Sequence, residues 1–445
     1  MDKVLVVGGG ISGKGATKLL KTFGFRTYLV DDKKSFKLGS LKQRLFDNLS
    51  MVVVSPGVEL SHELVVEANK RGIEVVGELE LAGRYLISDN IAITGTNGKT
   101  TTTLLTGHLL EGGDRVVRLG GNIGKALSTV VLDSTMLDIT VIEVSSFQLE
   151  TIRYFKPRVA CLLNITEDHL NRHKTMENYI KSKFRIFENQ EPYDKAILNL
   201  DDKVIMAQDL SLINAEKFYF STNSKCKGCY VFEDKIYFND GKDTKYVLDV
   251  QDIPLKGKHN LSNALAAILN AILIGEKIEN IKERIKSFKG AKHRLEFVAE
   301  VNGVTFINDS KATNISSTLS AMHAMTEHFT LLLGGSDKGY EFDQLFLEHI
   351  PLLKNIIVFG ETKQKILDAV ARCEVSNVYE TKSFNEAIKL GYELSEKNEV
   401  VLLSPACASF DMFSNFEERG DVFCKIVRNM QNRRIKVEKT KKEVH

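Results

Sequence analysis

The sequence predicts an α/β protein of three domains, each with a mainly parallel β-sheet and flanking helices. The chain of 445 residues is too long for one hydrophobic core, because single cores stop growing at roughly 250–300 residues. Short β-branched runs alternate along it with longer amphipathic stretches, which is the pattern of βα units. Glycine-rich loops follow two of the strand-like runs, at residues 8–13 and 95–98, and each loop precedes a helix-like stretch.

The first domain is predicted over residues 1–88 and has a Rossmann-like pattern. Strand-like runs at 3–7, 27–31 and 51–54 each end at glycine, aspartate or proline, and a helix-like stretch at 13–23 follows the first run. Strands that alternate with helices in this way form a parallel sheet.

A central domain is predicted over residues 89–291, and it opens with a strand at 90–94. Residues 217–250 are expected to form antiparallel hairpins, before an apolar helix from His259 to Gly275. Further strands of its sheet are expected at 139–143, 159–163 and 195–198.

The third domain, residues 292–445, has a second Rossmann-like pattern. Its tail from about Gln431 is charged, and we expect it to fray. The strands of this domain are expected at 304–307, 329–333, 355–359 and 400–403.

The charge balance excludes a protein built to bind polyanions over its whole surface. The 60 basic and 58 acidic side chains nearly cancel, so no global field would attract nucleic acid or an anionic membrane. The N-terminus lacks the pattern of a secretory signal, and no segment has the roughly 18 consecutive apolar residues of a membrane span. We therefore expect a cytoplasmic protein.

Cysteine usage also fits a reducing compartment, since six cysteines are few for this length. Cys226 and Cys229 form the one C-x-x-C pair in the sequence, and no second pair or histidines at ligand spacing follow it. A hairpin turn at KCKGC is therefore favoured over a zinc site.

The strongest local signal is GTNGKTT at residues 95–101, between a strand and a helix. Glycines let backbone N–H groups fold around a phosphate chain, and the helix N-terminus adds partial positive charge. Lys99 can then reach the β- and γ-phosphates, while the Thr100 hydroxyl can bind Mg²⁺. Residue 93 is Ile where the usual P-loop spacing has its first glycine, so a plain glycine turn is the alternative.

This loop resembles the ATP loop of the Mur ligases and of their relatives, the folylpolyglutamate synthases. Further segments resemble Mur ligase motifs in the family's order, and together they extend from Lys3 to about Arg428. They are EVSSFQL at 143–149, NITEDHL at 164–170, HNLSNALAA at 259–267, HR at 293–294, NDSKATN at 308–314, GGSDKG at 334–339, SPACAS at 404–409 and NFEERG at 415–420.

The resemblance implies an ATP-dependent ligase that uses two Mg²⁺ ions. Glu143 and His169 match magnesium ligands of the family, beside the hydroxyl of Thr100. Lys183 matches a lysine that CO₂ carbamylates, which turns a repelling ammonium into an oxygen ligand. The catalytic set implied is therefore Lys99, Glu143, His169 and Lys183, and the same resemblance assigns ATP binding to Gly95, Thr96, Asn97, Gly98, Lys99, Thr100, Thr101, Asn260, Asn263, Arg294, Asp309 and Lys311.

The first domain also matches a dinucleotide fingerprint. GGGISG at 8–13 contains G-x-G-x-x-G, and Asp31 lies 18 residues beyond Gly13. Alone, this pattern would favour an NAD-dependent oxidoreductase. The family resemblance instead implies a UDP-linked substrate, held by Ile11, Ser12, Asp31, Asp32, Lys33 and Gly57, with Asn122 in the next domain.

SPACAS and NFEERG resemble the branch of the family that joins D-glutamate to UDP-N-acetylmuramoyl-L-alanine. Some relatives have aspartate where this chain has Ser336, so contacts from that position stay open. Cys407 has no histidine near it in sequence and is interpreted as a packing residue. The resemblance assigns D-glutamate binding to Thr313, Lys338, Ser409 and Phe416.

The implied reaction passes the γ-phosphoryl group of ATP to the L-alanyl carboxylate, after which the amine of D-glutamate attacks the acyl phosphate. Positioning and charge neutralisation would be the protein's contribution. We expect small-molecule partners alone, a monomer, and closure of the third domain on the second. Another Mur ligase, a folylpolyglutamate synthase-type ligase, an oxidoreductase and a nucleotide-binding regulatory module are the alternatives.

Overall fold

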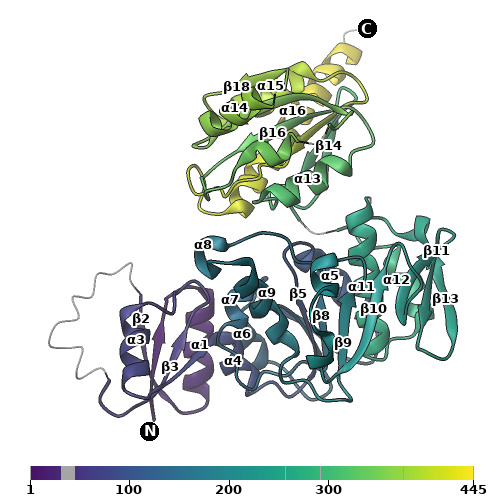
Figure 1. Cartoon of the computed structure of the whole chain (residues 1–445). Coiled ribbons are helices and arrows are strands. Elements are labelled where there is room, and N and C mark those ends of the chain that lie inside the picture. The colour runs from purple at the N-terminus through teal and green to yellow at the C-terminus, as the bar shows by residue number, and fades with distance from the viewer. Residues whose placement is uncertain are drawn as a thin grey trace. The chain divides into compact units, whose positions relative to one another are not determined.

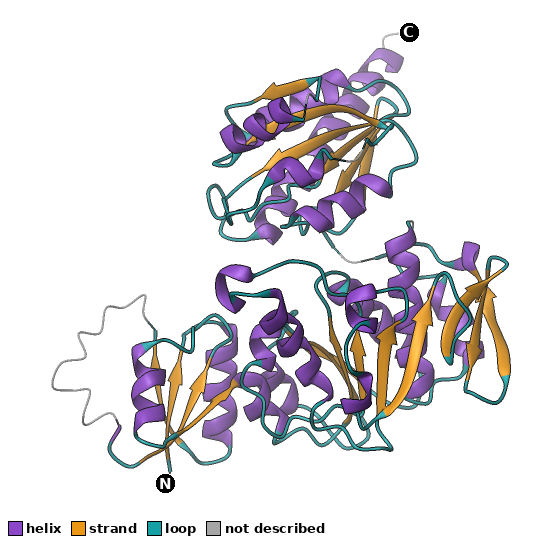
Figure 2. Cartoon of the chain, in the orientation of Figure 1, coloured by secondary structure: helices purple, strands orange, loops and turns teal. Residues whose placement is uncertain are grey.

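The computed structural model describes residues 2–31, 46–255, 257–290, 292–347, 349–373 and 375–443. The chain divides into two compact units, residues 1–254 with 260–288, and residues 255–259 with 289–445. Three β-sheets with flanking helices make up these units, so the predicted α/β class is confirmed (Figures 1 and 2).

The first sheet has the order β2-β1-β3-β4, and all of its pairs are parallel. Helix α3 covers one face, where Leu64 and Val65 pack on Val52 and Val54. Its elements are β1 (Lys3–Val7), α1 (Ile11–Thr22), β2 (Arg26–Val30), β3 (Leu49–Val54), α3 (Glu63–Lys70), β4 (Glu74–Gly77) and α4 (Glu78–Gly83).

The other face of this sheet shares a core with the central sheet. Leu19 and Leu20 of α1 belong to the same buried cluster as Leu127 and Val130 of α6 (Leu127–Val131). Each such fully buried leucine contributes roughly 1.5–3 kcal/mol. A Cβ at Gly15 would lie 2.6 Å from the Ser128 Oγ, so the two helices pack closely. The first two predicted domains therefore form one compact unit, and the boundary at residue 88 stays a prediction.

The central sheet has nine strands in the order β13-β12-β11-β10-β9-β8-β5-β7-β6. β5 lies between β8 and β7 and is parallel to both. The strands are β5 (Asp89–Thr94), β6 (Val117–Gly121), β7 (Ile139–Glu143), β8 (Val159–Leu162), β9 (Lys195–Asn199), β10 (Glu216–Ser221), β11 (Gly228–Phe232), β12 (Lys235–Asn239) and β13 (Thr244–Asp249), and the helices are α5 (Lys99–Leu110), α6 (Leu127–Val131), α7 (Ser146–Leu149), α8 (Leu170–His173), α9 (Met176–Phe184), α10 (Lys203–Met206), α11 (Lys258–Leu273) and α12 (Ile278–Ile285).

The prediction of antiparallel hairpins over 217–250 was partly wrong. β11, β12 and β13 are antiparallel, but β10 and β11 are parallel, so KCKGC is the end of a crossover loop and the start of β11, not a hairpin turn. Gly228 has φ +130°, and a side chain there would overlap the backbone of Tyr219, which explains the glycine at this position. Cys226 and Cys229 are free thiols, and the Cys226 Sγ lies 3.5 Å from the Tyr219 carbonyl oxygen.

The third sheet has the order β14-β15-β19-β16-β17-β18. The four predicted strands are present, whereas the antiparallel edge strand β14 and the short β18 were not predicted. One face packs against α13 and α14, and the other against α15 and α16. The elements are β14 (Glu296–Val301), β15 (Val304–Asn308), α13 (Ile315–His323), β16 (Phe329–Gly334), β17 (Leu353–Phe359), α14 (Lys363–Arg372), β18 (Val378–Glu380), α15 (Phe384–Leu394), β19 (Val400–Leu403) and α16 (Phe416–Glu443).

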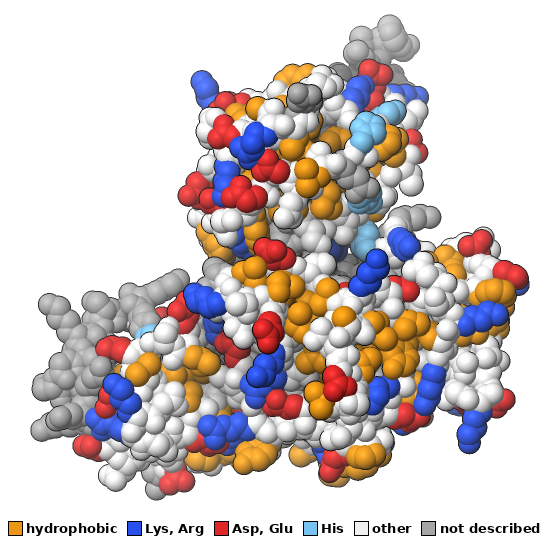
Figure 3. Space-filling view, viewed as in Figure 1, with side chains coloured by type: hydrophobic (Ala, Val, Ile, Leu, Met, Phe, Trp, Pro, Cys, Tyr) orange, Lys and Arg blue, Asp and Glu red, His pale blue; other side chains and the backbone are white. Residues whose placement is uncertain are grey.

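Helix α16 continues through Glu443, so the charged tail is helical, and its fraying stays a prediction. Among the described residues, no helix combines the length and the apolar character needed to cross a membrane. Acidic and basic side chains are interspersed on the face shown in Figure 3, which fits the near balance of charge in the sequence.

Candidate active site

The loop between β5 and α5 requires its two glycines. Gly98 is left-handed (φ +82°), and a Cβ there would overlap the side-chain amide of Asn263. Gly95 has φ +158°, and its Cβ would lie 2.9 Å from the Leu163 Cβ. Only glycine fits at these two positions. The loop that they allow, together with the first turn of α5, supplies the backbone N–H groups that the sequence predicts to bind phosphate.

Asn164, which follows β8, holds this loop in place. Its side chain donates to the Asn97 carbonyl oxygen (3.0 Å) and accepts from the Asn97 N–H (2.8 Å). Its own carbonyl accepts from the Thr96 N–H at 2.9 Å. Sequence analysis did not assign a role to Asn164, although it begins the quoted NITEDHL segment.

Lys99 begins α5 and folds back over the loop. Its Nζ donates to the carbonyl oxygens of Gly95 and Thr96, each at 2.8 Å. The ammonium therefore lies on the loop that the sequence predicts to bind a triphosphate.

A carboxylate also lies beside the N-terminus of α5. Glu143 ends β7 with 2% of its surface exposed, and it accepts from the Thr100 hydroxyl (2.6 Å) and the Asn122 amide (2.8 Å). Asn122 was assigned to the UDP substrate, and the structure places it on this acid. Hydroxyl and carboxylate oxygens are ligands that suit Mg²⁺.

Lys183 of α9 is buried, with 1% of its surface exposed, and its Nζ donates to the Gly95 carbonyl oxygen at 2.8 Å. Burial and the nearby charge of Lys99 lower its pKa well below the ordinary range, against the opposing attraction of Asp168. The neutral amine is thereby favoured, which is the form that reacts with CO₂. Sequence analysis missed Asp168, although it directly precedes His169.

His169 caps the N-terminus of α8 in a left-handed conformation (φ +55°). Its Nε2 lies 3.5 Å from a carboxylate oxygen of Asp168, and its ring contacts Phe147 edge-on at 4.8 Å between centroids. Asp168 thus links the environments of His169 and Lys183. The described structure brings Lys99, Thr100, Glu143 and Lys183 around one loop, with His169 next to them through Asp168.

Asn260 and Asn263 lie on α11 and are both buried. Asn263 donates to the Asn260 side-chain oxygen at 3.4 Å, and it is the residue that a side chain at Gly98 would strike. The structure therefore places Asn263 against the phosphate loop.

The glycine loop of the first sheet is also tightly built. A Cβ at Gly9 would overlap the Asp31 carboxylate, and one at Gly13 would overlap the Gly8 carbonyl oxygen. The Ser55 hydroxyl donates to the same carbonyl at 3.1 Å. Among the other residues assigned to the UDP substrate, Ile11 and Ser12 lie in the first turn of α1, Gly57 is exposed, and Asp32 and Lys33 lie outside the described residues.

In the second unit, three quoted motifs follow the carboxyl ends of the neighbouring strands β15, β19 and β16. Asp309 is fully buried and accepts from the Ser404 hydroxyl at 2.8 Å, while the Arg294 Nε lies 3.9 Å away. Burial raises the pKa of Asp309 to about 6, against the opposing charge of Arg294. Open α/β sheets bind ligands at this edge.

Arg419 holds these loops together and was not predicted as a site residue. It is fully buried, and its guanidinium donates to the carbonyl oxygens of Ser310 (2.8 Å), Cys407 (3.0 Å) and Ala408 (3.1 Å). Cys407 is buried and its pKa is raised to about 12 by burial, which supports a packing role.

The remaining residues assigned to this end lie on the same loops. The Lys311 Nζ lies 5.2 Å from the centre of the Phe416 ring, and Ser409 is buried. Thr313 is half-buried, whereas Lys338 is exposed, 5.9 Å from the Tyr340 ring. Ser336, the position left open, exchanges hydrogen bonds with Asp411.

A separate cluster of three potential metal ligands has no room for a metal ion. One ligand atom each of His293, Glu296 and Cys424 lies within 4.8 Å of the others. The Asn308 amide nitrogen lies between them, 2.8 Å from the His293 Nδ1, 3.2 Å from the Cys424 Sγ and 3.4 Å from the Glu296 carboxylate. The amide fills the place that an ion would need.

The fold and the loop after β5 define a P-loop-type nucleotide-binding protein. Family models match most of the chain: "Mur ligase MurD-like, N-terminal domain" at residues 2–77, "Mur ligase middle domain" at 93–271 and "Mur ligase, glutamate ligase domain" at 293–407. The chain belongs to the Mur ligase family, whose members are ATP-dependent amide-bond-forming ligases.

Curated relatives match over nearly the full length. A UDP-N-acetylmuramoylalanine--D-glutamate ligase from Caldicellulosiruptor bescii is 42% identical, with 96% of this chain and 97% of the relative covered. The enzyme of the same name from Thermoanaerobacter sp. (strain X514) is 40% identical, with 96% and 98% covered.

Solved structures share the fold at lower identity. UDP-N-acetylmuramate-alanine ligase from Thermotoga maritima superposes with a TM-score of 0.62 at 17% identity, covering 96% of this chain and all of that one. MurF from Acinetobacter baumannii gives a TM-score of 0.62 at 18% identity, covering 88% of each chain. Both likenesses concern the architecture and confirm the predicted arrangement of mainly parallel sheets.

Proposed function

We propose that this protein joins D-glutamate to UDP-N-acetylmuramoyl-L-alanine, with ATP as the energy source. The main support is the loop at residues 95–101, around which Lys99, Thr100, Glu143 and Lys183 gather. The names of the curated relatives give the substrates. The match to the MurD-like N-terminal model favours the UDP interpretation of the GGGISG loop over the dinucleotide one.

ATP would bind over the loop, with its phosphates on the backbone N–H groups and Lys99 at the β- and γ-phosphates. Asn260 and Asn263, and from the second unit Arg294, Asp309 and Lys311, complete the proposed nucleotide set. Thr100, Glu143, His169 and carbamylated Lys183 would hold two Mg²⁺ ions, which when bound neutralise charge on the phosphates.

The burial of Lys183 beside Lys99 supports the proposed carbamylation. The neutral amine attacks CO₂, a new N–C bond forms, and one proton leaves to solvent, so that the side chain becomes an anionic carbamate. The carbamate places an anionic group beside the Lys99 ammonium, so that opposite charges attract where two ammonium groups would repel.

In the first chemical step, a carboxylate oxygen of the L-alanyl group attacks the γ-phosphorus and the bond to the ADP oxygen breaks. Lys99 stays with the transferring group and stabilises its charge. The amine of D-glutamate then attacks the acyl carbon and loses a proton, and phosphate leaves with the carboxylate oxygen that attacked phosphorus, while the other carboxylate oxygen stays in the amide. Holding the reactants in position supplies most of the catalysis.

The two other ligands are proposed to bind at the strand ends of the first and third sheets. Ile11, Ser12, Asp31, Asp32, Lys33 and Gly57, with Asn122, are proposed for the UDP substrate, and Thr313, Lys338, Ser409 and Phe416 for D-glutamate. We also propose a cytoplasmic monomer with domain boundaries near residues 88 and 291.

A phosphate-release assay tests the function. We expect release only when ATP, Mg²⁺, UDP-N-acetylmuramoyl-L-alanine and D-glutamate are all present. Phosphate release that persists without the muramoyl substrate would reject the proposal. Replacing D-glutamate by L-glutamate, L-lysine or meso-diaminopimelate in the same assay distinguishes this branch from other amino-acid ligases.

A further inference from the structure

We propose that Arg172 is a positioning residue that couples the UDP-side loop, residues 55–58, to the segment that carries His169. The inference rests on the proposed function, since it assigns that loop to the UDP substrate and His169 to the metal. Arg172 itself belongs to none of the residue sets assigned above.

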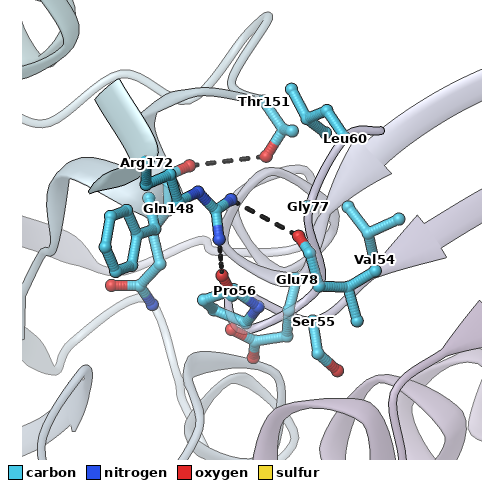
Figure 4. A pocket seen from close by; sticks show the side chains of 11 residues that line it. Val54, Ser55, Pro56, Leu60, Gly77, Glu78, Gln148, Thr151 and Arg172 are labelled. Atoms are coloured by element: carbon cyan, nitrogen blue, oxygen red, sulfur yellow. Dashed lines mark hydrogen bonds between the residues drawn. The ribbon is translucent and has the colours of Figure 1, made fainter. Parts of the chain in front are cut away.

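The guanidinium reaches the UDP-side loop through its main chain. Nη1 donates to the Pro56 carbonyl oxygen at 2.9 Å and Nη2 to the Val58 carbonyl oxygen at 3.4 Å (Figure 4). These two carbonyls flank Gly57. Arg172 belongs to α8, which lies between strands β8 and β9 of the central sheet. These bonds therefore join segments that are 114 and 116 residues apart in sequence.

The other face of the guanidinium is held by the segment after Glu143. Nη2 and Nε donate to the two carboxylate oxygens of Glu150, at 2.6 and 3.3 Å, and both side chains are at most 16% exposed. The guanidinium carbon also lies 4.4 Å from the centre of the Phe147 ring. A planar group with five donors can serve two carbonyls and a carboxylate together, whereas an ammonium cannot.

The segment that carries His169 depends on contacts with neighbouring segments for its position, because α8 is short. It has four residues, and left-handed residues flank it on both sides, His169 at φ +55° and Lys174 at φ +69°. Phe147 contacts both the His169 ring and the Arg172 guanidinium. A displacement of the Arg172 side chain would therefore displace His169 through the Phe147 ring, which both residues contact, as well as through the main chain.

Arg172→Lys keeps the charge but loses the fork of donors. We expect it to raise the KM for UDP-N-acetylmuramoyl-L-alanine and the Mg²⁺ concentration for half-maximal rate by about tenfold each. The KM for D-glutamate should change by less than about twofold, since the Arg172 contacts given above all lie within the first unit.

Arg115→Lys is the matched control. Arg115 also donates to two carbonyl oxygens, of Leu137 (3.1 Å) and Asp138 (2.9 Å), and to a carboxylate, of Asp89 (2.8 Å). These contacts lie where β5 and β7 begin, at the strand ends opposite the phosphate loop. Both variants should lose similar thermal stability, but the control should keep the wild-type KM and Mg²⁺ dependence.

Isothermal titration with UDP-N-acetylmuramoyl-L-alanine, in the absence of ATP, gives a second readout. Weaker binding by Arg172→Lys than by Arg115→Lys supports the coupling. Equal binding and equal Mg²⁺ dependence in the two variants, or an equal rise of both KM values and of the Mg²⁺ concentration for half-maximal rate, would overturn it. A wild-type enzyme with no D-glutamate-dependent phosphate release would instead refute the proposed function, so the two failures are distinguishable.

Discussion

At the scale of single residues, burial of the Lys183 amine costs folding stability, and the proposed metal-binding role would explain that cost. An amine buried beside Lys99 with its pKa driven downward destabilises the fold, because the unfolded chain binds the proton more tightly. Lys183→Met should therefore keep or raise the melting temperature while activity falls at least about 100-fold through loss of the proposed metal ligand. Differential scanning calorimetry with the phosphate assay checks this; a variant that retains wild-type turnover contradicts the role.

Asp309 gives a pH-dependent prediction. Its pKa is raised to about 6 in the folded protein, so the folded state holds the proton more tightly than the unfolded state. The contribution to stability is present below about pH 4 and is lost as the pH rises to about 6, by about 2–3 kcal/mol in total. Asp309→Asn should flatten that part of the curve when urea unfolding is measured from pH 4 to 7. An unchanged slope would show that Asp309 has an ordinary pKa.

The site residues could be predicted from the sequence, but the residues that hold the site loops by hydrogen bonds could not. Lys99 and Glu143 stand in quoted segments, Lys183 was assigned by the family resemblance alone, and the structure brings the three together. Asn164 contacts Asn97 across 67 residues and Arg419 contacts Ser310 across 109, so no local pattern reveals either bond. Long-range hydrogen bonds of this kind depend on the packing of the sheets.

At the scale of elements, the phosphate loop depends on one left-handed glycine. Gly98→Ala would add strain at φ +82° and would also strike Asn263. Gly72→Ala is the control, because Gly72 has φ +69° and open space around it. Each variant should lose about 1 kcal/mol of stability from strain, but only Gly98→Ala should weaken ATP binding, by tenfold or more, in isothermal titration. Equal ATP affinity in both variants would contradict the role of the loop.

The strands themselves were largely predictable, since alternation of apolar runs and helices marks a parallel sheet. The exceptions have physical reasons. β10 and β11 are joined by a loop as short as a hairpin, yet Gly228 lets the chain pair in parallel. β14 is an edge strand with an exposed Phe297, so it lacks the apolar run of a central strand.

At the scale of the whole molecule, the residues proposed for ATP divide between the two compact units. Lys99 belongs to one unit and Arg294 to the other. We expect ATP, Mg²⁺ and the muramoyl substrate together to lower the radius of gyration in small-angle X-ray scattering, because both units must reach one nucleotide. Identical profiles with and without the ligands would count against closure. The single unit formed by the first two sheets was not predictable, since the packing of α1 on α6 has no sequence signal of its own.

The central claim is that the loop at residues 95–101 presents a triphosphate whose terminal group passes to a carboxylate. Oxygen tracing tests it most directly, with UDP-N-acetylmuramoyl-L-alanine labelled with ¹⁸O in the alanyl carboxylate. The account predicts that the phosphate released with D-glutamate carries one ¹⁸O atom, detected by mass spectrometry or by the shift of its ³¹P resonance. Released phosphate without the label would contradict it.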